Sequence, residues 1–191
     1  MDSKTESKIM TLIAQTVESA PKVASEVLAE TQKGLGFIPN MYGLMANNPA
    51  LLDAYTKSYK TFRENSGFTP QEQEIIFLSV AYENECTYCV AAHSFIADKM
   101  SKVPVEITDA IRAGNEVEGK LGALSRFSRI MVEKRGNVSE EEISDFLEAG
   151  YSQEHILGVV AGIGVKTFSN YFNHIANTPV DPAFSSREWS K

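Results

Sequence analysis

The chain has 191 residues, of which 43% are hydrophobic and 23% charged, and its formal net charge is −7. This length and composition are typical of one globular domain, and the negative charge with scattered Lys and Arg excludes a general nucleic-acid binder. Apolar runs are short and the first ten residues are polar. We therefore expect neither a membrane span nor a secretory leader, and we expect a cytoplasmic location.

The first part of the chain predicts helices on either side of a connector. Apolar residues recur at three- and four-residue steps over 10–31, with a break at Pro21, which predicts two short helices or one interrupted helix. Residues 34–49 have little regular period and are predicted to be a loop-rich connector. Over 49–67 an apolar stripe, with proline in the first turn and glycine at the end, predicts a helix.

The middle and end of the chain predict a further series of helices. Thr69 and Glu72 form a capping-box pattern with Pro70 at the first helical position, which predicts a helix over 70–84. The next helix is predicted to begin near Cys86 and to end near Met100. Further helices are predicted over 104–114, 119–136, 140–150 and 152–177. The helix over 119–136 has basic residues in its last turn, and the one over 140–150 follows a second capping box. Residues 178–191 are predicted to be an extended tail.

Three glycines in the last predicted helix, Gly158, Gly162 and Gly164, indicate a close-packing face. A phosphate-binding loop is excluded because no strand precedes them. The chain also lacks a solenoid repeat and the alternation typical of a sheet. We therefore predict an all-α protein with one domain over 1–191: N-terminal helices and connector (1–48), a core with the cysteine pair (49–177) and a C-terminal tail (178–191).

The segment "CTYCVAAH" contains both cysteines of the chain and one of its three histidines. Residues three and four apart share one face of a helix, so Cys86, Cys89 and His93 are predicted to lie on a single stripe. A helix N-terminus near Cys86 would stabilise a thiolate, which is the nucleophilic form of cysteine. His93 could then accept or deliver protons. This combination of residues indicates thiol chemistry.

Glu74 is predicted to reach His93 from the preceding helix. If the helices over 70–84 and 86–99 form an antiparallel pair through the short Asn84–Glu85 connection, a residue ten before the turn lies level with one about ten after it. A carboxylate beside a histidine fixes the orientation of the ring and raises its affinity for protons. The sequence thus predicts a Glu74 to His93 to cysteine proton relay.

The spacing of these four residues carries a family resemblance. Glu74, eleven intervening residues, the Cys86-x-x-Cys89 pair, three residues and His93 resemble the active-site signature of the AhpD alkylhydroperoxidase branch of the carboxymuconolactone decarboxylase family. The resemblance extends over residues 39–62 and 69–97. The decarboxylase branch generally lacks the cysteine pair, which disfavours lactone decarboxylation.

The resemblance implies an AhpD-like helical fold, a homo-oligomer built as a trimer or a multiple of one, and reduction of hydroperoxides. It assigns Cys89 as the peroxidatic thiol, Cys86 as the resolving thiol, and Glu74 with His93 as the proton relay. Peroxide would oxidise Cys89 to a sulfenic acid, Cys86 would condense with it, and an external lipoamide-like or thioredoxin-like dithiol would reduce the disulfide. It implies neither haem nor metal nor any other cofactor.

One residue departs from the family pattern. AhpD itself carries a second histidine between the two cysteines, where this chain has Tyr88. A phenol with a pKa of about 10 is a poorer proton acceptor than imidazole. The departure implies a shorter proton relay or a weaker peroxidase activity.

Several other interpretations of the cysteine pair are open. The two cysteines could be inert core residues, or with His93 they could bind zinc, although a structural zinc site usually requires four ligands and no second Cys/His cluster exists. A thioredoxin-like site would need a βαβ unit, which is not predicted. Besides the peroxidase, we consider a disulfide oxidoreductase that relays electrons without peroxide turnover and a non-catalytic oligomer that senses oxidants.

The remaining polar and aromatic residues have structural interpretations. His155 is predicted to lie in the first turn of the last helix, and we predict a structural or interface role for Asn170, Asn173 and His174 ahead of catalysis. Five aromatic residues could line an organic hydroperoxide pocket but fit a helical core better: Phe37, Tyr42, Tyr55, Tyr59 and Phe62.

Overall fold

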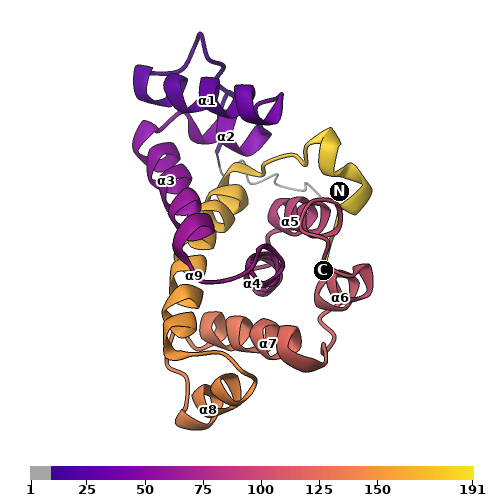
Figure 1. Cartoon of the computed structure of the whole chain (residues 1–191). Coiled ribbons are helices and arrows are strands. Elements are labelled where there is room, and N and C mark those ends of the chain that lie inside the picture. The colour runs from indigo at the N-terminus through magenta and orange to yellow at the C-terminus, as the bar shows by residue number, and fades with distance from the viewer. Residues whose placement is uncertain (1–9) are drawn as a thin grey trace, which may run out of the picture.

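A computed structural model describes residues 10–191, and the polar start of the chain over 1–9 lies outside the described residues. Over the described range the chain is helical and contains no strand, which confirms the predicted all-α class (Figure 1). No helix in this range is long and apolar enough to cross a membrane. The elements are α1 (Lys22–Leu35), α2 (Asn40–Met45), α3 (Pro49–Asn65), α4 (Pro70–Glu83), α5 (Thr87–Lys99), α6 (Val105–Arg112), α7 (Gly119–Glu133), α8 (Glu140–Glu148), α9 (Gln153–Ala176) and the 3-10 helix η1 (Pro182–Arg187).

Helix α4 is the centre of the fold. Every residue over 72–82 is buried, and α5, α6, α7 and α9 pack around it (Figure 1). The predicted capping box forms at its start: the Thr69 hydroxyl accepts from the Glu72 N–H at 3.3 Å, and the Glu72 carboxylate accepts from the Thr69 N–H at 2.9 Å. Because α4 is apolar on nearly all sides, it can be stable only when other helices surround it.

The turn between α4 and α5 is as short as predicted. Glu85 adopts a left-handed conformation with φ 55°, and Cys86 is the N-cap residue of α5. The Cys86 N–H donates to the Ala81 carbonyl at 2.9 Å, so the turn is closed by the backbone of α4. This connection brings α5 directly against α4.

The N-terminal region differs from the prediction. Residues 10–20 are not helical, and the first helix begins only after Pro21. The Gln15 N–H donates to the carbonyl of Gly43 at 2.8 Å, and the Asn47 side chain donates to the Ile13 carbonyl, so this segment is held by contacts with α2 and the residues after it. The predicted connector in turn contains α2. Its apolar side chains are buried, and tertiary contacts therefore outweigh local periodicity here.

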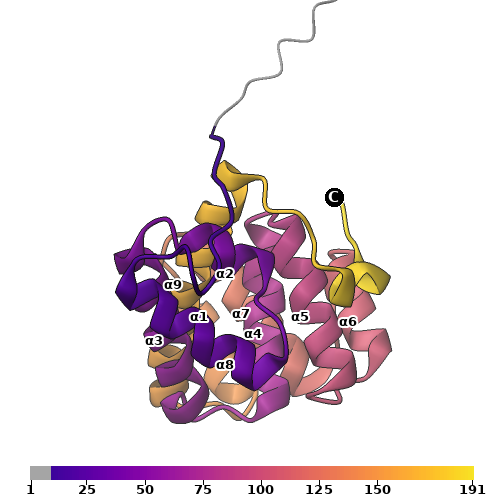
Figure 2. The same ribbon diagram turned by 90° about the horizontal axis from the view of Figure 1, so that it is seen from above.

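Two predictions nearer the C-terminus are also corrected. Helix α7 ends at Glu133, so Lys134 and Arg135 follow it rather than forming its last turn. The tail is not simply extended. It contains η1, which packs against α5 after crossing the molecule from the end of α9 (Figure 2).

Two of the three glycines in α9 form the predicted close-packing face. A Cβ on Gly158 would lie 2.8 Å from the Ser66 carbonyl oxygen and from the Phe68 ring, and a Cβ on Gly162 would lie 2.8 Å from Ile76 Cγ2. Gly164 is exposed, and no atom lies within 4 Å of where a Cβ on Gly164 would be, so the prediction of a close-packing face is wrong for this residue.

The glycines of α9 provide a matched pair of variants. Gly158→Ala should lower the free energy of unfolding by about 1–3 kcal/mol, because the methyl group meets a backbone carbonyl that cannot move freely. Gly164→Ala should raise it by up to about 1 kcal/mol, because alanine is the better helix former and the site is open. Urea unfolding of both variants measures the difference, and equal effects would contradict the proposed packing face.

Candidate functional site

The four residues predicted from the sequence come together beside the first turns of α5. Cys86 and Cys89 are both free thiols, and both are buried, with Cys89 2% exposed. The two sulfurs share one hydrogen-bond donor, Asn173 Nδ2, which lies 3.8 Å from Cys86 Sγ and 3.3 Å from Cys89 Sγ. The sulfurs therefore face the same side of the helix.

Glu74 contacts His93, as the antiparallel arrangement predicted. The Glu74 Oε2 atom lies 2.8 Å from His93 Nδ1, and Glu74 is fully buried. Burial alone would raise the pKa of Glu74, but the charges and hydrogen bonds of His93 and Arg63 outweigh it and lower that pKa. An ionised carboxylate can only accept, so His93 Nδ1 carries the proton and Nε2 keeps a free lone pair.

His93 is neutral in this environment. Burial is the main cause that lowers its pKa, the charge of Lys166 lowers it further, and the contact with Glu74 only partly opposes these effects. A neutral imidazole with a free Nε2 can accept a proton. The pair therefore has the protonation states that a general base and its orienting carboxylate require.

Arg63 is a site residue that sequence reasoning missed. It lies on α3, forms an ion pair with Glu74 through Nη2, and donates from the same atom to the Tyr59 hydroxyl at 2.6 Å. A signal was present in the sequence, because Arg63 continues the apolar stripe of Tyr55 and Tyr59 at four-residue spacing. A charged residue on a buried face needs a buried partner.

Asn173 is a second residue whose position corrects the prediction. We predicted a structural or interface role for it, yet its side chain donates to both cysteine sulfurs. The structural interpretation holds for Asn170, whose side chain accepts from Asn84 at the end of α4. It also holds for His155, whose Nδ1 accepts from the Ser152 N–H at the start of α9, whereas His174 is exposed.

Lys166 is the third missed residue, on the face of α9 that approaches the cysteines. It is 1% exposed, and within residues 10–191 its Nζ has no hydrogen-bond partner. Its Nζ lies 5.5 Å from the centroid of the Phe77 ring, which is a cation–π contact. A lysine within the apolar "VVAGIGVKTF" stretch was a visible but unused signal.

The environments of the two thiols differ. Burial opposes ionisation of Cys89 and would raise its pKa. Four interactions together hold this pKa well below its ordinary value: the hydrogen bond from Cys86, the charge of Lys166, the contact with His93 and the hydroxyl of Ser169. The hydrogen bond to Cys89, followed by burial, raises the pKa of Cys86. Cys89 is therefore the thiolate of the pair and Cys86 the thiol that donates to it.

A cavity of about 610 Å³ opens beside this group. Cys89, His93 and Glu74 line it, whereas Cys86 does not. Of the five aromatic residues considered above, three line the cavity, so the core interpretation is incomplete for Tyr42, Tyr55 and Tyr59. The remaining wall is largely apolar and includes Leu35, Pro39, Met41, Ile96, Met100 and Phe184.

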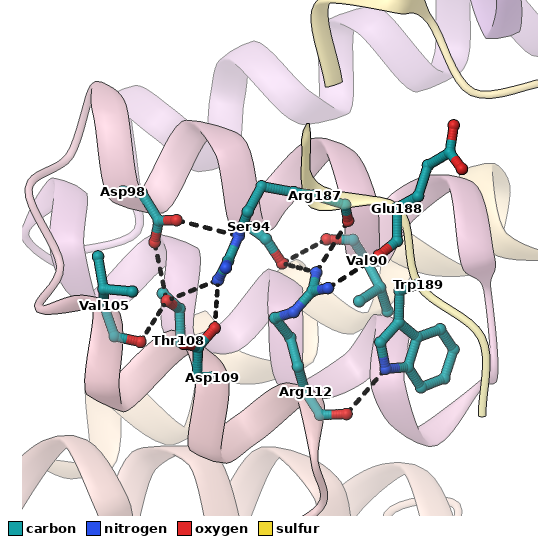
Figure 3. Close-up of polar contacts among 10 residues, drawn as sticks. All are labelled: Val90, Ser94, Asp98, Val105, Thr108, Asp109, Arg112, Arg187, Glu188 and Trp189. Atoms are coloured by element: carbon teal, nitrogen blue, oxygen red, sulfur yellow. Dashed lines mark hydrogen bonds and ion pairs between the residues drawn. The ribbon is translucent and has the colours of Figure 1, made fainter. Parts of the chain in front are cut away.

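The C-terminal tail is fastened to α5 and α6 (Figure 3). Arg187 forms ion pairs with Asp98 at 3.0 Å and with Asp109 at 2.7 Å. Arg112 donates to Ser94 and to the tail carbonyls of Arg187 and Glu188, and the Trp189 indole donates back to the Arg112 carbonyl (Figure 3). These contacts hold η1 and its Phe184 in the cavity wall.

Tyr88 attaches the start of the tail to the cysteine helix. Its hydroxyl donates to Asp181 Oδ2 at 2.6 Å, while Asp181 Oδ1 accepts from the Asn40 N–H at 3.0 Å. Burial and the neighbouring Asp181 carboxylate raise the pKa of Tyr88. At the position where AhpD carries a histidine, this chain therefore has a hydrogen-bond donor that fixes the tail.

The helices are arranged in an AhpD-like fold. Residues 49–125, which contain Glu74, both cysteines and His93, match the carboxymuconolactone decarboxylase family. This match agrees with the resemblance that the sequence motif predicted.

Three solved structures share the fold. An AhpD-core, uncharacterised peroxidase-related protein from Ralstonia eutropha JMP134 has a TM-score of 0.78 at 22% identity, with 88% of this chain and 90% of that chain covered. A peroxidase-related protein from Silicibacter sp. TM1040 has a TM-score of 0.75 at 18% identity, covering 87% and 89%. A cysteine-to-alanine variant of the debrominase Bmp8, in complex with 2,3,4-tribromopyrrole, has a TM-score of 0.74 at 18% identity and covers 97% of both chains. A comparison with curated protein sequences gives no match.

The role of Tyr88 can be tested by removing its hydroxyl. Tyr88→Phe should lower the free energy of unfolding by about 1.5–3 kcal/mol, because the lost hydrogen bond has a charged acceptor. Amide hydrogen exchange over 182–187 should become faster, because the tail loses one attachment. Tyr171→Phe, at a side chain that is 62% exposed, is the matched control. Unchanged exchange in Tyr88→Phe would contradict the attachment role.

Proposed function

We propose that the protein is a thiol-dependent peroxidase that reduces organic hydroperoxides. The observation that carries the proposal is the position of Cys89, which faces an apolar cavity beside the Glu74–His93 pair while Cys86 lies behind it, outside the cavity lining. Cys89 is thus placed to contact a substrate in the cavity, whereas Cys86 is placed to contact only Cys89.

The proposed reaction begins with the Cys89 thiolate, while neutral His93 takes up one proton from the solvent. The thiolate attacks the hydroperoxide, the O–O bond breaks, and Cys89 becomes a sulfenic acid. Protonated His93 gives its proton to the alkoxide that leaves, so the product is an alcohol. Glu74 orients the ring and stabilises its transient positive charge.

Cys86 completes the oxidative half of the cycle. Its sulfur attacks the sulfenic sulfur of Cys89, a disulfide forms, and the hydroxide that leaves takes the Cys86 proton and becomes water. The raised pKa of Cys86, caused mainly by its hydrogen bond to Cys89, keeps that proton in place until this step. An external dithiol, lipoamide-like or thioredoxin-like, then supplies two electrons and one proton, releases its second proton, and restores the Cys86 thiol and the Cys89 thiolate. A cytoplasmic location, where thiols are kept reduced, belongs to the same proposal.

A second candidate function is reductive debromination of a small aromatic compound. It is favoured by the aromatic lining of the cavity and by the similarity in fold to a debrominase that binds a brominated pyrrole. The overall chemistry would oxidise the two thiols to the disulfide while a C–Br bond is replaced by C–H and HBr is released. Bromide release from 2,3,4-tribromopyrrole in the presence of a dithiol distinguishes this candidate from the peroxidase.

The peroxidase is tested by mass spectrometry of the thiols together with peroxide consumption. After treatment with cumene hydroperoxide, the wild type should lose two hydrogens through an intramolecular disulfide, and Cys86→Ser should retain an oxygen on Cys89. Cys89→Ser should stop peroxide consumption with dihydrolipoamide, and Glu74→Gln should slow it by about 10²-fold, because the base loses its orientation.

Four outcomes would overturn parts of this proposal. Two inert thiols would exclude both the peroxidase and the disulfide relay. Trapping of oxygen on Cys86 would reverse the roles of the two cysteines. If the dithiol exchanges with the protein disulfide while peroxide persists, the protein is an electron relay; if oxidation changes only the state of assembly, it is a redox sensor.

We also propose that the chain forms a homo-oligomer, a trimer or a multiple of one, through the outer face of α9. Five large hydrophobic side chains are exposed on this helix, in two groups separated by a step of eight residues, which is typical of an interaction surface. They are Leu157, Val160, Phe168, Tyr171 and Ile175.

The oligomer is tested by sedimentation. The wild type should sediment at three times 21.1 kDa or at a multiple of that mass, whereas Tyr171→Glu should shift towards the mass of one chain, because it places a charge in the apolar face. Lys22→Glu, at an exposed side chain at the start of α1, should have no effect. A wild type that sediments as a single chain contradicts the proposal.

A further inference from the structure

The buried ammonium group of Lys166 requires a partner. It lies 1% exposed on α9 and lines the cavity, yet within residues 10–191 its Nζ makes no hydrogen bond. An isolated charge is costly to bury, so buried charges are normally paired. The Phe77 ring at 5.5 Å provides only a weak attraction. The cavity must therefore supply an anion.

The carboxylate of the cavity does not fill this role. Among the described residues, Glu74 is the only acidic residue that lines the cavity. Its Oε1 atom is paired with Arg63 on α3 and its Oε2 atom with His93 on α5. Both oxygens are thus engaged by groups other than Lys166.

The phenols of the cavity do not supply the anion either. Burial raises the pKa of Tyr42 on α2 and of Tyr55 and Tyr59 on α3, and burial and Asp181 raise that of Tyr88 on α5. These groups are therefore neutral. The remaining acidic group that faces the cavity is the thiol of Cys89.

We propose that Lys166 is the counter-ion of the Cys89 thiolate and holds this cysteine in its reduced, nucleophilic form. The ammonium comes from α9 and the sulfur from the first turn of α5, and both face one cavity. Burial raises the pKa of Cys89, but the hydrogen bond from Cys86 and next the charge of Lys166 lower it, which agrees with this geometry. The inference rests on the proposed thiol chemistry at Cys89 but not on which substrate oxidises it.

The pairing also affects the redox equilibrium. When an external dithiol reduces the Cys86–Cys89 disulfide, the S–S bond breaks, two electrons enter, and the products are the Cys86 thiol, the Cys89 thiolate, one released proton and the oxidised dithiol. Oxidation removes the thiolate and leaves Lys166 without its counter-ion. Lys166 therefore favours the reduced pair.

The test compares Lys166→Met, which keeps the volume and removes the charge, with Lys166→Arg, which keeps the charge. The rate of alkylation of Cys89 by iodoacetamide is followed against pH, with the modified residue identified by peptide mapping. In Lys166→Met the midpoint should rise by at least about one pH unit, so the rate at pH values below the wild-type midpoint should fall about tenfold. Lys166→Arg should retain most of the wild-type rate, and Lys57→Met should retain all of it.

A redox titration gives a second readout. In Lys166→Met, the equilibrium constant for reduction of the disulfide by dithiothreitol should fall about tenfold, equivalent to about 30 mV. An alkylation midpoint and an equilibrium constant that both equal those of the wild type would overturn the proposal. These measurements need no peroxide, so a protein that fails as a peroxidase can still confirm Lys166, and an active peroxidase can still refute it.

A double-mutant cycle separates pairing from simple packing. In the Cys89→Ser background the anion is absent, so Lys166→Met should raise the urea midpoint, because it removes an uncompensated buried charge. With Cys89 present the same substitution should raise it less or lower it. Equal shifts in the two backgrounds would show that Lys166 and Cys89 are not coupled, which contradicts the proposal.

Discussion

The structure depends on one buried charge, the carboxylate of Glu74. This group lies in the central helix with no exposure to solvent, and it is anionic only because Arg63 and His93 flank it. Removing one partner of such a buried pair lowers the free energy of unfolding by about 3–5 kcal/mol, so each of the three side chains constrains where the other two lie. They come from α3, α4 and α5. The ion pair with Arg63 and the hydrogen bond with His93 that fix how these helices pack therefore also orient the imidazole beside the reactive thiol.

Charges of opposite sign alternate through the site. Arg63, Glu74, Lys166 and, in the proposed reduced state, Cys89 provide two cations and two anions around a largely apolar cavity. Burial and the nearby cation explain why His93 is neutral although it contacts a carboxylate. A neutral base, an ionised thiol and a protonated second thiol can then coexist within one small volume. Each of these states depends on its neighbours more than on its own ordinary acidity.

The sequence predicted the parts of the site that depend on short-range geometry. Glu74, Cys89 and His93 belong to two consecutive helices joined by three residues, the last of which is Cys86, so counting along the chain was enough to bring them together. Arg63 was visible as a charge on an apolar stripe. Lys166 and Asn173 lie on α9, outside the segment that matches the family, and no spacing rule relates that helix to α5. Their positions follow from how α9 packs against α4, which is a tertiary property. The same holds for residues 10–20 and for the tail, whose conformations are set by contacts with distant segments rather than by local periodicity.

The origin of the cavity wall has an evolutionary consequence. The reactive groups stand on α4 and α5 in the middle of the fold, whereas Phe184 and Met41 come from the tail and from α2, which are peripheral segments. Substitutions, insertions or changes of length are tolerated far better in such segments than in a buried helix. Descendants of one ancestral gene could therefore diverge in the molecules they accept while their sulfur chemistry stays the same.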